Sequence, residues 1–188
     1  MNRGNYRVIG ILSSSGGPKP LSMIVRKVNV PASIVVLQHI PINFFPIFVK
    51  NLLKEARMPL EVLGEKKDNF LIRGKIYLVP PTYNAILKRV NILRLVEPDT
   101  HFVPSGDVFF SSMAEIAPKK SVAVLLSGIG NDGVEGAFSL SMKGGLVVVQ
   151  DPSTMDFDGI PGAAIRRGVI CKVLKPQEIG DYLNSLFE

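Results

Sequence analysis

The sequence predicts an α/β protein with a doubly wound, mostly parallel sheet, helices on both faces and an added antiparallel ribbon. Two observations support this fold class. Short, continuous apolar runs alternate along the chain with helix-like segments, as is typical of parallel strands buried on both faces. A middle stretch is richer in short strands, two of which flank Arg89-Val90-Asn91, a pattern typical of a hairpin.

The first predicted strand, residues 8–12, stops at three serines, Ser13 to Ser15. Gly16 and Gly17 then allow a sharp turn, and a proline in the next few residues suits the first turn of a helix, which we expect over residues 21–27. A second buried strand over residues 33–38 ends at His39, and a helix over residues 46–56 follows.

The remaining elements follow from the same patterns. The strand-rich stretch is predicted over residues 61–63, 75–79, 85–89 and 92–96, and a helix begun by Ser105 or Asp107 over residues 108–116. Further strands are expected over residues 121–126, 146–150 and 169–174, with one helix ending near Lys143 and a last one running from Pro176 to Phe187.

Length and composition limit the class of protein. At 188 residues, with 46% hydrophobic residues and no linker or internal repeat, the chain is expected to form one domain spanning 1–188. No apolar run approaches the ~18 residues of a membrane span, and the first run is shorter than the roughly 7 to 15 residues of a signal peptide. We therefore expect a soluble, cytoplasmic protein without membrane insertion.

Charge and cysteine content narrow the partners. The net charge is +6, yet the 22 Lys and Arg residues form no run longer than two and are not interleaved with aromatic residues. This favours acidic partners over nucleic acid. The single cysteine, Cys171, excludes an intramolecular disulfide and fits a reducing compartment. No close spacing of histidine, cysteine and carboxylates indicates a metal site, and His101 is expected on a solvated loop.

Three predicted strands are followed by chemically useful residues: the serines after residue 12, His39, and the loop Ser127-Gly-Ile-Gly-Asn-Asp132-Gly133. Carboxyl ends of parallel strands open on one edge of a sheet, so these side chains are expected to converge. A hydroxyl, an imidazole and a carboxylate are the set needed for nucleophilic acyl transfer. With only two histidines in the chain, the base is nearly determined.

Plainer interpretations compete with this one. A strand-end serine is often only a helix N-cap, a histidine such as His39 is often structural, and Asp132 could simply cap a helix. The loop also contains G-x-G-x-x-G from Gly128 to Gly133, with Asp151 roughly 20 residues on, which matches a dinucleotide-binding fingerprint. That alternative is weakened by Asp132, which would place a negative charge where pyrophosphate binds.

Several motifs together resemble one family. Ser14-Ser-Gly-Gly-Pro18, Gln38-His-Ile-Pro41, Tyr77-Leu-Val-Pro80, Pro104-Ser-Gly-Asp107 and Leu126-Ser-Gly-Ile-Gly-Asn-Asp-Gly133 stand in the order and approximate spacing of the chemotaxis protein-glutamate methylesterases, the CheB family. The likeness covers nearly the whole chain. Carried over from the family motifs, Ser14 is the nucleophile, His39 the base and Asp132 the aspartate. Counting back from Gly16 selects Ser14 over its neighbours.

The resemblance implies a serine esterase that hydrolyses glutamate γ-methyl esters on the cytoplasmic helices of chemoreceptors, releases methanol, and in some members deamidates glutamines. It implies no cofactor. A backbone N–H near the third loop, such as that of Ile129, would stabilise the oxyanion, and the Ser15 hydroxyl, where the family has threonine, would support the triad.

Departures from the family pattern leave alternatives open. Leu12 and Ser13 replace a glycine and an alanine and could move the nucleophile. Phe102 and Val103 stand where members often have histidine and arginine, and Asp156 and Asp158 would add negative charge near the cleft. The family normally carries a receiver domain, here expected to be separate or removed. A catalytically silent receptor-binding relative is therefore a second hypothesis, and a dinucleotide-binding protein a third.

Overall fold

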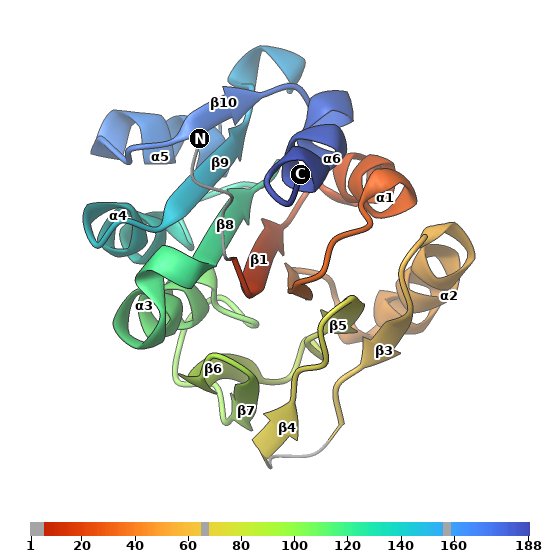
Figure 1. Ribbon diagram of the computed structural model, residues 1–188. Helices are drawn as coiled ribbons and strands as arrows, with labels where there is room; N and C mark the ends of the chain where they lie inside the picture. The colour runs from red at the N-terminus through yellow and green to blue at the C-terminus, as the bar shows by residue number, and fades with distance from the viewer. Residues whose placement is uncertain (1–5, 65–67, 156–158) are drawn as a thin grey trace.

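The computed structural model describes residues 6–64, 68–155 and 159–188. Its main sheet has seven strands in the order β10-β9-β8-β1-β2-β5-β3, every pairing of which is parallel. The strands are β1 (Val8–Ser13), β2 (Ser33–Gln38), β3 (Leu60–Val62), β5 (Lys75–Leu78), β8 (Ser121–Leu125), β9 (Leu146–Gln150) and β10 (Lys172–Leu174). Figure 1 shows the sheet lying between two layers of helices. The predicted doubly wound α/β fold is confirmed.

The central strands are apolar except at their ends, as expected for strands whose two faces are both covered. Every residue of β1, β2 and β8 is buried. On one face lie α1 (Pro18–Lys27), α2 (Phe45–Glu55) and α6 (Pro176–Ser185); on the other lie α3 (Gly106–Ile116), α4 (Val134–Met142) and α5 (Gly159–Arg167). Successive residues of a strand point to opposite faces. Ile9 and Ile11 therefore pack in the hydrophobic cluster beneath α1, α2 and α6, while Val8 and Leu12 pack in the cluster beneath α3 and α4.

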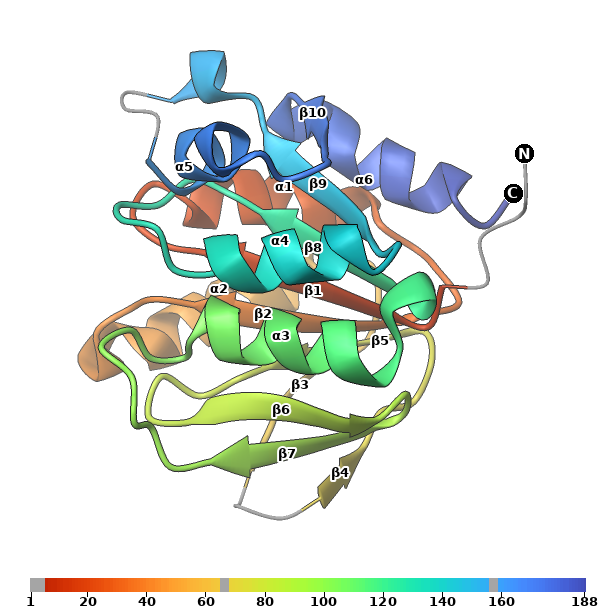
Figure 2. The ribbon, with the colours of Figure 1, turned by 90° about the vertical axis from the view of Figure 1, so that its left-hand side faces the viewer.

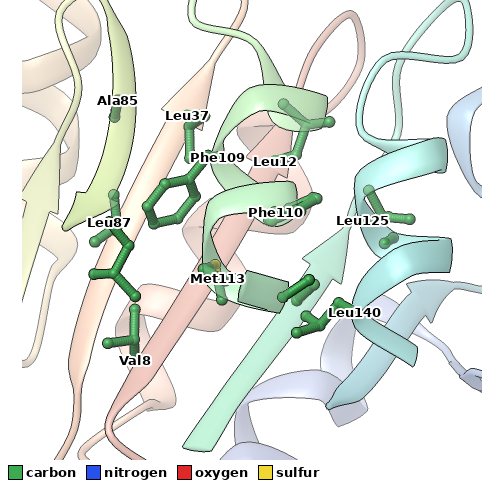
Figure 3. Close-up of a cluster of buried hydrophobic side chains, with 14 of the residues drawn as sticks. Val8, Leu12, Leu37, Ala85, Leu87, Phe109, Phe110, Met113, Leu125 and Leu140 are labelled. Atoms are coloured by element: carbon green, nitrogen blue, oxygen red, sulfur yellow. The ribbon is translucent and has the colours of Figure 1, made fainter. Parts of the chain in front are cut away.

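Helix α3 packs directly over β1 and β2. Figure 3 shows its side chains Phe109, Phe110 and Met113 among residues of the strands, including Leu12 and Leu37. All five of these side chains are fully buried. The start of α3 is therefore held rigidly above the carboxyl ends of the central strands.

The predicted antiparallel ribbon is confirmed as a separate three-stranded sheet in the order β4-β7-β6. Its strands are β4 (Asp68–Phe70), β6 (Asn84–Arg89) and β7 (Ile92–Val96). Strand β6 contributes Ala85 and Leu87 to the cluster beneath α3. The ribbon thus extends the core on the α3 side (Figure 2).

Two predicted element starts differ from the structure by three residues. The last strand begins at Lys172 rather than residue 169, because α5 occupies the preceding segment and residues 168–171 turn out of it. Gly168 has a positive φ of 82°, and the Val169 N–H donates to Ala164 O to close the helix. Helix α1 begins at Pro18, three residues earlier than predicted.

No helix within the described ranges combines the length and apolarity needed to cross a bilayer.

Candidate active site

Three loops meet at the carboxyl ends of β1, β2 and β8, which are adjacent in the sheet. Backbone hydrogen bonds tie the loops together: His39 N–H donates to Ser13 O, and Ser14 N–H donates to Ser127 O. The convergence predicted from the strand ends is therefore present: Ser14, His39 and the loop that carries Asp132 lie at one edge of the sheet.

His39 and Asp132 form a buried pair. Their Nε2 and Oδ2 atoms are 3.0 Å apart, and the side chains are only 12% and 3% exposed. The same Nε2 is 3.0 Å from Pro104 O. Since both neighbours are acceptors, Nε2 carries the hydrogen and donates to them. The pairing fixes both the tautomer and the orientation of the ring.

The other ring nitrogen of His39, Nδ1, is buried and has no hydrogen-bond partner among the described residues. With Nε2 protonated, Nδ1 holds a free lone pair and is the basic atom of the ring. The face of the ring stacks on Phe102, with centroids 5.4 Å apart and planes at 17°. Phe102 therefore restrains the imidazole from a direction that hydrogen bonds do not cover.

Asp132 sits at the amino end of α3, where backbone N–H groups favour an anion. Oδ1 accepts from Ser105 Oγ at 2.9 Å and Asp107 N at 3.2 Å, and Oδ2 accepts from Gly106 N at 2.6 Å in addition to His39. Burial alone would raise the pKa of this carboxyl, but these hydrogen bonds, led by that from His39, outweigh it and hold the pKa below its usual value. The group is thus a stable carboxylate.

The turn that aims Asp132 inward depends on Gly133. Its φ is 83°, in the left-handed region, and a Cβ there would lie 2.6 Å from the Leu12 side chain. This also explains why the G-x-G-x-x-G stretch does not have the character of a phosphate loop. Its acidic residue is directed into the protein toward α3.

Ser14 follows β1 directly and is 9% exposed. Its carbonyl accepts from Gly17 N at 2.9 Å and from Gln38 Nε2 at 3.2 Å, so the backbone of the loop is fixed. The Ser14 hydroxyl makes no hydrogen bond to another described residue. A Cβ on Gly128 would lie 2.5 Å from Ser14 Cβ, which shows how closely the third loop approaches this serine.

The other predicted residues lie around this centre. The Ser15 side chain is exposed, and its carbonyl accepts from Ser127 Oγ. Ile129 is 62% exposed on the third loop. His101 is exposed but contacts the edge of Phe102, with ring centroids 5.0 Å apart. Asp156 and Asp158 lie outside the described residues.

Sequence reasoning missed the surroundings of the histidine–aspartate pair. Ser105 was predicted only as a start of α3, Pro104 only as part of a motif, and Phe102 as a departure from one. The signal available was the Pro104-Ser-Gly-Asp107 motif itself. Nothing in its spacing indicates that its hydroxyl, carbonyl and N–H groups turn toward two other loops.

This combination defines a class: an α/β domain whose parallel sheet carries, at its carboxyl edge, a serine beside a buried histidine–aspartate pair. Comparison with known proteins narrows it. The family model described as CheB methylesterase matches residues 9–183, and the chain belongs to this family.

The similar proteins agree with that membership. The chain is 34% identical over 185 residues to protein-glutamate methylesterase/protein-glutamine glutaminase 3 of Hahella chejuensis, covering 95% of this chain and 52% of the relative. It is 31% identical to the enzyme of the same kind from the group 3 operon of Rhizobium meliloti, covering 95% and 51%. The chain thus spans about half the length of these curated relatives.

A solved structure matches over nearly its full length. The crystal structure of the Thermotoga maritima CheB methylesterase catalytic domain superposes with a TM-score of 0.88 at 30% identity, covering 96% of this chain and 98% of that one. The fold described above is therefore that of a CheB catalytic domain.

Proposed function

We propose that this chain is a serine esterase that hydrolyses glutamate γ-methyl esters on the cytoplasmic helices of chemoreceptors and also deamidates glutamines there. Residues 1–188 would act as one catalytic domain in the cytoplasm. Family membership and the names of the relatives support the reaction class. The observation that carries the proposal is the state of His39: one nitrogen is held by Asp132, and the other is left basic.

The chemistry follows from that arrangement. The oxygen of the Ser14 hydroxyl attacks the ester carbonyl while Nδ1 of His39 takes the hydroxyl proton. Asp132, already a carboxylate, stabilises the imidazolium that forms. Collapse of the tetrahedral intermediate expels methoxide, which receives the proton from Nδ1 and leaves as methanol. Water then attacks the acyl-enzyme by the same proton route, giving glutamate and free Ser14.

The developing oxyanion needs a donor on the side of the nucleophile away from His39. The backbone N–H of Ile129 fits this role because its loop passes against Ser14 at Gly128. One such donor is typically worth about 3 kcal/mol of transition-state stabilisation. In this proposal the Ser15 hydroxyl, which is exposed beside the nucleophile, has a supporting role for the triad.

The test is methanol release from methylated chemoreceptor membranes by the purified chain and its Ser14→Ala variant. We expect release by the parent and a loss of about 10⁴-fold or more in the variant, as in other serine triads. Ser15→Ala is the matched control from the same loop and should retain activity within about tenfold.

The same variants should be assayed on a small activated ester. Equal release of methanol by Ser14→Ala and the parent would overturn the assignment of the nucleophile. Binding of receptor membranes without hydrolysis of either ester would establish the silent receptor-binding relative instead.

A further inference from the structure

A concave basic surface lies at the end of the molecule opposite the active site. It is an open cavity of about 520 Å³. We call it the basic hollow and define it by the residues Lys88, Arg89, Val90, Ile116, Lys119 and Lys120. Neither the proposed reaction nor the family motifs involve these residues.

Its position follows from the direction of two elements. Helix α3 begins at Gly106, beside Asp132, and ends at Ile116; strand β6 begins at Asn84, whose side chain accepts from Ser105 N, and ends at Arg89. Both therefore run from the active-site edge to the far edge. Figure 2 shows the end of α3 and the β6–β7 turn on the same side, away from the loops that carry the site.

The four cations of the hollow are exposed and are not neutralised within the described part of the chain. None of them forms an ion pair there, whereas Arg26, Lys27, Arg94 and Arg167 are each paired with a carboxylate. Lys88 and Arg89 interact with Asp68 only through longer-range attraction, because both carboxylate oxygens of Asp68 accept hydrogen bonds from Arg94. The hollow thus concentrates positive charge that an external anion would meet.

Between these cations the surface is apolar. Ile116 is 44% exposed and Val90 is half-buried, and none of the described residues that line the cavity is aromatic. A ligand that carries carboxylates could pair with the cations at the rim, and an aliphatic or aromatic side chain of the same ligand could pack against the apolar centre. Proteins that bind single-stranded nucleic acid usually present aromatic side chains on which bases stack, and the described lining of the hollow contains none.

We propose that the basic hollow binds an acidic segment of a partner protein, with an apolar side chain seated between Val90 and Ile116 and flanking carboxylates paired with the four cations. Because the hollow lies at the far edge from Ser14, such a segment would tether the domain to its partner without occupying the active site. Binding at the hollow would not depend on the esterase activity.

The test measures binding of a fluorescently labelled peptide of glutamates flanking one phenylalanine, by anisotropy. Lys119→Glu/Lys120→Glu should raise Kd by about tenfold or more, since reversing two charges replaces attraction by repulsion. Lys50→Glu/Lys54→Glu, an equal charge change on the exposed face of α2, is the matched control and should change Kd by less than about threefold. Ile116→Ser should raise Kd by several-fold, and so should replacing the phenylalanine of the peptide by glycine.

A cooperative thermal unfolding transition in each variant would establish that it is folded. No binding up to about 1 mM peptide overturns the proposal. Equal weakening by both double reversals also overturns it, since binding would then follow net charge alone. Patch-dependent binding of RNA or of phosphatidylserine vesicles in place of the peptide would assign the hollow to a different class of partner.

Discussion

The surroundings of the two His39 ring nitrogens differ in how many hydrogen bonds they contain. On the Nε2 side, Asp132 is buried and accepts hydrogen bonds from a hydroxyl, two backbone N–H groups and the ring. On the nucleophile side, the Ser14 hydroxyl and Nδ1 have no hydrogen-bond partner among the described residues, and the serine is positioned by its backbone and by the close approach of Gly128.

The two sides of the His39 ring should therefore respond differently to mutation. In the proposed mechanism, several hydrogen bonds orient the base before substrate binds, whereas the nucleophile is positioned by its backbone and by the close approach of Gly128. Catalytic hydrogen bonds often tighten only when substrate binds. Loss of one hydrogen-bond donor to Asp132 should therefore change the activity little, whereas one methyl group added next to Ser14 should lower it strongly.

The largest effect is expected from Asp132→Asn. The amide nitrogen must replace an oxygen that faces backbone N–H donors, so either orientation opposes donor to donor and disturbs the His39 tautomer. We expect kcat on a small ester to fall by about 10⁴-fold. Circular dichroism should show that the fold is kept. Turnover near that of the parent would remove Asp132 from the proposed mechanism.

Gly128→Ala tests the close contact between the third loop and Ser14. The new Cβ would lie 2.5 Å from Ser14 Cβ and 2.7 Å from the Ile160 side chain, so the serine must shift. A displacement of about 1 Å can cost about 10²-fold in rate, and we expect a loss of that order in kcat. Gly64→Ala is the matched control, since a Cβ there meets nothing within 4 Å. Equal activities of the two variants would show that the serine is not held by this contact.

Ser105→Ala removes one of the donors to Asp132 together with the N-cap of α3. Three donors remain, so kcat should fall by no more than about tenfold. The lost cap should lower the free energy of unfolding by about 1 kcal/mol. Urea denaturation and small-ester kinetics measure the two effects separately. A loss of activity as large as that of Asp132→Asn would contradict the redundancy inferred for this region.

Acid should act on the two carboxyls at the start of α3 with opposite sign. The lowered pKa of Asp132 contributes stability that is present above about pH 4 and lost as pH falls through that lowered pKa. Burial raises the pKa of Asp107 despite its hydrogen bond from Gly136 N, so its contribution grows as pH falls. Urea denaturation from about pH 6 to pH 3 should show a flatter loss of stability for Asp132→Asn and a steeper one for Asp107→Asn. Parallel curves for all three proteins would contradict both signs.

Much of this architecture was predictable because it depends on local pattern. The predicted bounds of β2, β7 and β9 agree with the structure. The serine, the histidine and the aspartate were found because strand ends of a parallel sheet share an edge. The roles assigned to Ser14, His39 and Asp132, and those of Ser15 and Ile129, stay predictions.

What escaped prediction depends on tertiary contacts. Helix α5 contains Gly159, Pro161 and Gly162, which are poor helix formers, and it is stabilised by burial of Ile160 and Ala164. Strand β4 has only three residues, too few for a periodicity, and its Asp68 pairs with Arg94 of β7. The donors around Asp132 come from a loop nearly thirty residues earlier, a proximity no local pattern encodes.

Asp132 also holds two parts of the scaffold together. Its carboxylate fastens the first turn of α3 to the loop after β8, so the side chain would remain useful in a relative that had abandoned hydrolysis. An aspartate at this position in a relative therefore indicates an intact fold as much as an active enzyme. Ser14, which anchors nothing through its hydroxyl, is the better marker when pseudoenzymes of this family are sought.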